Sequence, residues 1–212
     1  YELMKALREP LRLEQIGFSV AQYSYYRRFR DQFPDIESGN YYLLKEWEIT
    51  GRARNGKPDL DLIRRYERRL GVPHLWGPLV ADRAVFLGRK TTFFQDYRPH
   101  FSHDEMLNIL QWGLVEMERL FDEVQPDFLV SFVCVTFEDY LAYLFAQSRG
   151  IPCFNLRHTR IKNYMTGADS IFEPAERIRA AYYRYRDGAN DDGWMEQARE
   201  HLDMVSSGKA RY

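Results

Sequence analysis

The sequence predicts an α/β fold in which a Rossmann-like parallel sheet is flanked by helices and joined to a helix-rich N-terminal region. Two apolar runs, 128–134 and 151–156, support the sheet because they are continuous rather than alternating, as in strands buried on both faces. A helical segment precedes each run, and a Pro-Asp pair or a glycine marks the change from helix to strand. This order is typical of a β-α-β unit with a helix in front of it.

The first hundred residues are rich in aromatic and basic side chains and contain few strand signals. Helical patterns cover three segments: 24–34, 41–49 and 57–73. In the third segment, Asp59 is placed to cap the helix and Gly71 to end it. Residues 80–101 have no clear period, and we expect irregular structure there with one short strand or helix at 83–87.

Long helices and buried strands are predicted from Ser102 onward. Ser102 and Glu105 form a capping-box sequence, and the helix behind them carries an apolar stripe at spacings of three and four. Thr136 and Asp139 repeat the pattern before the next helix, and Gly150 is placed to end it. Two further helices are expected: 173–186 and 192–205.

The predicted domain organisation is a helix-rich region, 1–100, packed on an α/β unit formed by 101–212. We expect these two parts to make one compact domain. The chain begins at Tyr1 and ends in a polar tail, so we also expect it to be a fragment of a longer protein.

Charge and composition argue against several classes of protein. With 30 basic and 31 acidic residues, the chain has no overall attraction to nucleic acid or to an anionic membrane. Its longest apolar run, 128–137, is about half the roughly 20 residues that a membrane-spanning helix needs. Two cysteines are too few for a disulfide scaffold or a paired-cysteine zinc site, which favours a cytoplasmic location.

Polar side chains follow both predicted strands at their carboxyl ends, where ligands bind in open α/β sheets. The first group is Thr136, Glu138 and Asp139, and the second is Arg157, His158, Thr159 and Arg160. A carboxylate facing guanidinium and imidazole groups can act as a general base or accept a hydrogen bond from a sugar hydroxyl. The arginines suit phosphate or carboxylate groups. In the alternative interpretation, Glu138 only stabilises a helix N-terminus and Arg160 pairs with it at the surface.

Other chemistries have less support in the sequence. His158 has no histidine partner at metal-ligand spacing, so we predict no metal site. Cys134 and Cys153 lie within the predicted strands and are expected to be core residues. The run at 25–30 mixes aromatic and arginine side chains as single-strand nucleic-acid binders do, but a solvated helix face explains it equally well. Glycine-rich phosphate loops and the G-x-S-x-G motif are absent, and no cofactor is predicted.

The motifs together resemble a known family. Between residues 40 and 186, the segments YYLLKEWEI, PDLDLIRRYERRLGVPHLW, ADR and VQPDFLVSFVCVTFEDYLAYLFAQSRGIPCFNLRHTRI resemble the N-terminal part of bacterial capsule and surface-polysaccharide biosynthesis proteins, which are related to GT-B glycosyltransferases. The resemblance rests on three features: a Pro-Asp before a buried strand, a helix ending in R-G-I-P, and a Thr-Arg after the next strand.

The resemblance implies an acceptor-side domain whose cleft is faced by Glu138, as the catalytic group, and by residues 157–160. A C-terminal domain beyond Tyr212 would hold the nucleotide-sugar, so the chain is not expected to transfer sugar alone. Its expected partners are an acceptor glycan or nucleotide-sugar and that missing domain, in the cytoplasm or peripheral to the inner membrane. The alternatives are a stand-alone carbohydrate or nucleotide-sugar binding module and a scaffold of a polysaccharide assembly complex.

Overall fold

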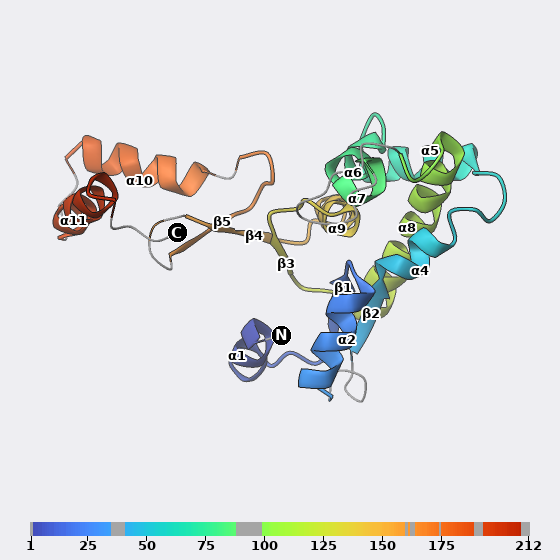
Figure 1. Ribbon diagram of the computed structural model, residues 1–212, viewed down its shortest axis with the longest axis horizontal. Coiled ribbons are helices and arrows are strands. Elements are labelled where there is room, and N and C mark those ends of the chain that lie inside the picture. The colour runs from blue at the N-terminus through green and yellow to red at the C-terminus, as the bar shows by residue number, and fades with distance from the viewer. Residues whose placement is uncertain are drawn as a thin grey trace. The chain divides into compact units, whose positions relative to one another are not determined.

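The computed structural model describes residues 2–34, 41–87, 99–159, 161, 164–173, 175–188 and 193–208. These residues form a mixed α/β structure that is 58% helix and contains small sheets of parallel and mixed strands, which confirms the predicted class but is not a clear Rossmann-like fold. The chain divides into two compact units (Figure 1). Unit 1 comprises residues 1–129 and 134–152, and unit 2 comprises 130–133 and 153–212. The predicted packing of 1–100 on 101–212 stays a prediction.

Unit 1 opens with a parallel strand pair that the sequence pattern did not predict. Its first elements are α1 (Glu2–Leu11), β1 (Ile16–Val20), α2 (Tyr23–Gln32), β2 (Tyr41–Lys45) and α4 (Glu46–Gly51). β1 and β2 run parallel, with Ile16 opposite Tyr41 and Val20 opposite Lys45. Because α2 connects the two strands, they form a β-α-β unit.

The prediction of one helix over 41–49 is wrong. The segment is the strand β2 followed at once by the helix α4. Its Tyr-Tyr-Leu-Leu run has aromatic residues that fit a strand, and Leu44 is buried beside the neighbouring strand. A short apolar run fits a strand and a helix turn equally well, so periodicity alone did not separate them.

The rest of unit 1 is helical and follows the predicted caps. It contains α5 (Leu60–Leu70), α6 (Trp76–Ala81), α7 (Arg83–Leu87), α8 (His103–Val124) and α9 (Phe137–Ser148). Asp59 caps α5, and the capping box of Ser102 and Glu105 opens α8. Gly71 and Gly150 take the left-handed conformation after α5 and α9, at φ of 70° and 67°.

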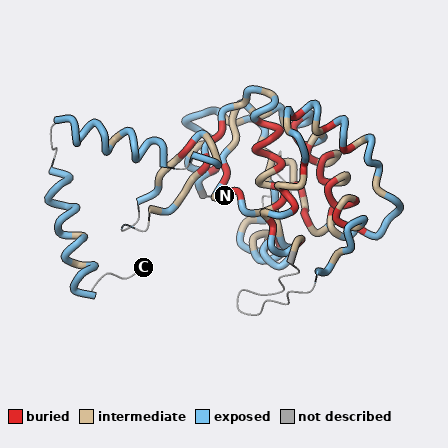
Figure 2. The backbone as a smooth tube through the Cα atoms, turned by 90° about the horizontal axis from the view of Figure 1, so that it is seen from above, coloured by how far each residue is buried: buried red, intermediate tan, exposed pale blue. Residues whose placement is uncertain are grey.

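The long helix α8 organises the core of unit 1, since it lies against β1, β2, α4, α5 and α9. Buried residues gather in these helices, as Figure 2 shows in red. Phe137, at the start of α9, has no exposed surface and lies against Gly113 of α8. A β-carbon at Gly113 would come within 2.4 Å of the Phe137 ring, so the close approach of the two helices depends on this glycine.

Unit 2 contains a three-stranded sheet in the order β3 (Leu129–Phe132), β4 (Cys153–His158), β5 (Met165–Ala168). β4 and β5 are antiparallel, which differs from the parallel sheet that the sequence predicts. The prediction missed β5 because its Met-Thr-Gly-Ala sequence carries neither an apolar run nor an alternation. Asn155 has no exposed surface, and its side chain bonds to Ser131 of β3 and to the Ala168 carbonyl of β5.

Two helices follow the sheet of unit 2, close to the predicted positions. They are α10 (Glu176–Arg186) and α11 (Trp194–Ser206). Neither contains a buried residue, and Figure 2 draws both almost entirely in the colour of exposed chain. Within the described residues, no helix is long and apolar enough to cross a membrane.

Candidate functional site

Four acidic residues of unit 1 lie together at the beginnings of three helices, and we call them the acidic cluster: Glu46, Asp82, Glu138 and Asp139. Glu46 is the first residue of α4 and directly follows strand β2. Asp82 precedes α7, and the other two stand in the first turn of α9. Helix N-termini favour negative charge, which explains why acidic side chains occupy these positions.

Asp82 ties two of these helices together. Its Oδ1 accepts hydrogen bonds from the backbone N–H groups of Ala84, at 2.7 Å, and Val85, at 3.2 Å, at the start of α7. Its Oδ2 accepts from the backbone N–H of Phe137, at 3.1 Å, at the start of α9. With both oxygens used in this way and only 5% of its surface exposed, Asp82 has a structural task.

Glu138 is the predicted catalytic residue, and it is fully buried. Among the described residues, neither of its carboxyl oxygens has a hydrogen-bond partner, and the same holds for Oε2 of Glu46, which is 5% exposed. Two unsatisfied carboxylates in such a place would be very costly if both were ionised. The protein therefore favours the protonated form of at least one of them.

The pKa values follow from this burial. Burial raises the pKa of Glu46 to about 7, and the negative charges of Asp82 and Asp139 raise it too. Burial also raises the pKa of Glu138 well above its ordinary value, and the neighbouring carboxyl of Glu46 adds to that increase. Since like charges so close do not both ionise readily, the Glu46–Glu138 pair holds a proton at neutral pH.

Thr136 and Asp139 form the more accessible side of the cluster. Thr136 caps α9, because its Oγ1 accepts a hydrogen bond from the Asp139 backbone N–H at 3.3 Å. Burial raises the pKa of the Asp139 carboxyl, while Thr136 opposes that increase. Both residues are half-buried, so the cluster meets solvent on their side.

The structure thus brings together three of the predicted site residues, Thr136, Glu138 and Asp139, and adds two that sequence reasoning missed. Glu46 was missed because its segment was interpreted as helix, although it comes two positions after the apolar run 41–44, close to the kind of position that singled out Glu138. Asp82 lay in a segment with no clear period.

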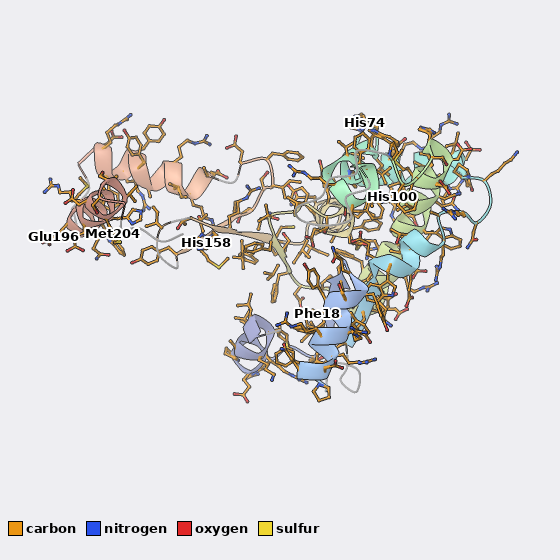
Figure 3. All side chains as sticks on the ribbon, viewed as in Figure 1. Phe18, His74, His100, His158, Glu196 and Met204 are labelled. Carbon is orange, nitrogen blue, oxygen red and sulfur yellow. The ribbon has the colours of Figure 1, made fainter. Side chains whose placement is uncertain are left out.

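The second predicted group belongs to unit 2, at the hairpin that joins β4 to β5. Arg157 and His158 are the last two residues of β4 and pair with Thr166 and Met165. His158 is exposed, and Figure 3 labels it on this strand. Arg157 is half-buried, and among the described residues its Nε has no hydrogen-bond partner.

Thr159 has a local role in that hairpin. Its hydroxyl lies 2.9 Å from the Tyr164 carbonyl and accepts from the Ile161 N–H at 3.2 Å. The side chain therefore helps to close the turn. Arg160, the last member of the predicted group, lies outside the described residues.

The described part of the chain contains no group of three His, Cys, Asp or Glu side chains that could hold a metal ion, the acidic cluster included. Cys134 and Cys153 are buried and form no disulfide. The Sγ of Cys134 lies 3.7 Å from the Asp139 carbonyl, to which a thiol can donate.

The raised pKa values of Glu46 and Glu138 allow the acidic cluster to store a proton. On the more accessible side of the cluster, Thr136 and Asp139 can accept hydrogen bonds from a ligand.

Comparison with known proteins found no matching family model, curated protein or solved structure.

Proposed function

We propose that the chain is the acceptor-side, N-terminal part of a glycosyltransferase that acts in the synthesis of bacterial surface or capsular polysaccharide. The observation that carries the proposal is the meeting of carboxyl groups that follow strands: Glu46 directly follows β2, and Glu138 opens the helix after β3. Ligands of α/β proteins bind at the carboxyl ends of strands. The family resemblance of residues 40–186 supports the same assignment.

The proposal extends to the architecture. The chain contains the order β1-α2-β2 and, later, β3-α9-β4. Strand-helix-strand units of this kind build Rossmann-like halves, and we propose that the strands belong to a fold of that class. A donor domain in a longer protein would then supply the nucleotide-sugar, so that this chain needs no glycine-rich phosphate loop.

In this function Glu138 is the general base that takes the proton of the acceptor hydroxyl. Burial raises the pKa of the Glu138 carboxyl well above its ordinary value, and once ionised such a group is a stronger base toward a hydroxyl proton than an ordinary carboxylate. Thr136 and Asp139, in the same unit, would hydrogen-bond the acceptor sugar. Unit 2, taken by itself, carries the second predicted group, where Arg157 would hold an anionic group and His158 and Thr159 would bond a sugar hydroxyl. Since Glu138 is fully buried, substrate reaches it only after the first turn of α9 moves.

Ligand binding by the chain is the first test. Calorimetry with acidic oligosaccharides of bacterial surfaces should give binding heat, and Arg157→Ala should weaken that binding at least about tenfold by removing a charged partner. Arg177→Ala is the matched control, because Arg177 is exposed on α10 and pairs with Asp169. Equal affinities in the two variants, or no heat with any glycan, would contradict the proposal.

Catalysis is tested in the longer protein that carries a donor domain. Glu138→Gln should lower the rate of sugar transfer at least about tenfold without a similar change in acceptor KM, because general-base groups contribute at least that much. Glu48→Gln, an exposed change on α4, is the control and should leave the rate unchanged. A Glu138→Gln enzyme with the wild-type rate would remove Glu138 from the mechanism.

A scaffold in polysaccharide assembly is the second candidate, favoured by exposed apolar side chains on α10 and α11. These residues are Ile178, Tyr182, Trp194, Met195 and Leu202, each at least half exposed. Such surfaces are typical of protein interfaces. A stable hetero-complex in pull-down experiments that is lost in Trp194→Ser/Leu202→Ser would support this candidate, whereas glycan binding without a protein partner would support the first.

A further inference from the structure

The Glu46–Glu138 pair satisfies its buried oxygens only if one of the two carboxyl groups is protonated and bonds to the other. A buried side chain normally satisfies its polar atoms, yet both Glu138 oxygens and one Glu46 oxygen lack hydrogen-bond partners among the described residues. Asp82 already provides the acceptor that the start of α9 needs, through the Phe137 N–H. Glu138 is therefore not required as a cap, and a glutamine or leucine would be less costly in its place.

We propose that the Glu46–Glu138 pair is a proton-operated latch that holds the turn leading from Cys134 into α9. While the two carboxyl groups share a proton, the first turns of α4 and α9 pack together. When the pair loses a proton to solvent water, negative charge appears in a buried site beside Asp82 and Asp139, and the repulsion releases the turn. The latch needs no sugar ligand, so it stands independently of the proposed function.

The surroundings of the pair determine the direction of the effect. Asp139, from α9 itself, and Asp82, from the connection between α6 and α7, both disfavour negative charge on the pair. α6 contains no titratable side chain, and Arg83 of α7 is exposed.

The helices α5 and α8 also pack against α9, and several of their charged groups are paired with residues outside the Glu46–Glu138 pair. Glu118 of α8 bonds to Tyr66 and Arg69 of α5. Glu105 and Glu116 of α8 pair with two arginines of the α4–α5 region, Arg54 and Arg52. The charges that act most strongly on the Glu46–Glu138 pair are therefore negative. While α4 and α9 are packed together, these charges oppose the loss of a proton from the pair.

The stability of unit 1 should consequently fall as pH rises. A carboxyl whose folded-state pKa is raised contributes its full stability below the unfolded-state value and loses it as pH rises through the folded-state value. For Glu46 this window runs from 4.5 to about 7. Within this window the folded state binds a proton that the unfolded state has lost. For each such proton, the unfolding equilibrium constant increases about tenfold when pH rises by one unit.

Cys134 offers a direct probe of the turn, because it is 7% exposed and lies four residues before Glu138. Its rate of alkylation, corrected for thiolate fraction with a glutathione reference, should rise at least about tenfold between roughly pH 6 and pH 8.5. Cys153, which is 3% exposed in unit 2, is the internal control in the same molecule.

The double variant Glu46→Gln/Glu138→Gln should abolish the pH-dependent rise at Cys134 and flatten the pH dependence of unfolding. Glu48→Gln, which changes an exposed carboxylate on the same helix, should behave as wild type. If the double variant does not fold, either single glutamine variant should shift the midpoint of the Cys134 transition.

Three results would overturn the latch. The first is a Cys134 rate that stays constant relative to Cys153. The second is the same rise in the double variant as in wild type. The third is protection of wild-type Cys134 at high pH by millimolar Mg²⁺ or Ca²⁺, which would make the pair a cation site instead.

Discussion

Gly113 is the residue on which the contact between α8 and α9 depends. A helix interior normally prefers alanine to glycine by about 1 kcal/mol. Here an added β-carbon would come within 2.4 Å and 2.5 Å of two Phe137 ring atoms and 3.1 Å from Leu141. Phe137 and Leu141 have no exposed surface, so they have little room to move. The steric conflict should outweigh the gain in helix propensity.

We therefore expect Gly113→Ala to lower the free energy of unfolding by about 1 to 3 kcal/mol, the usual cost of overpacking a core. Urea denaturation followed by tryptophan fluorescence measures it. Gly51→Ala is the control, because a β-carbon at Gly51, the last residue of α4, would meet nothing within 4 Å. A Gly113→Ala protein as stable as wild type would mean that α9 can shift away from α8.

At the scale of elements, Asp82 is the side chain that joins the beginnings of two helices. Asp82→Ala removes an N-cap of α7 and leaves the buried Phe137 N–H without an acceptor, so it should lower the unfolding free energy by about 3 kcal/mol. Asp82→Asn keeps one acceptor oxygen and should recover part of the loss. Chemical denaturation of the three proteins at one pH provides the comparison. Equal stability of the alanine and asparagine variants would contradict the two-helix role.

The elements also show which features the sequence could predict. The caps of α5, α8 and α9 were predicted because Asp59, Ser102 and Thr136 act within three residues of their own positions. β2 was not predicted, because its identity depends on pairing with β1, about 25 residues earlier. A helix cap can be predicted from a few neighbouring residues, whereas the pairing of two distant strands cannot.

The same distinction applies to the candidate site. Glu138 could be selected from its place after an apolar run, but its burial could not, since that depends on three helices that begin together. Glu46 and Asp82 lie 92 and 56 positions earlier in the chain. These residues come close to Glu138 because α4, α7 and α9 pack together. The spacing of residues in the sequence does not predict that packing.

At the scale of the whole molecule, the two units differ in how much they bury. Three of the four tryptophans, Trp47, Trp76 and Trp112, belong to unit 1, and Trp194 belongs to α11 of unit 2. α11 has no buried residue, and Trp194 is 52% exposed. A helix with so little buried area contributes little to the stability of the rest of the chain.

Deleting residues 188–212 should therefore leave the unfolding free energy of unit 1 within about 0.5 kcal/mol of its original value, as for other changes that remove no buried contacts. The shortened chain has tryptophan only in unit 1, so fluorescence in urea follows that unit alone. Trp194→Phe in the full-length chain is the matched reference, because it removes the same fluorophore and keeps α11. If the shortened chain unfolds at a clearly lower urea concentration than this reference, α11 stabilises unit 1, and its exposed apolar side chains serve the chain itself. If the two curves coincide, those side chains remain available to a partner, as the scaffold function requires.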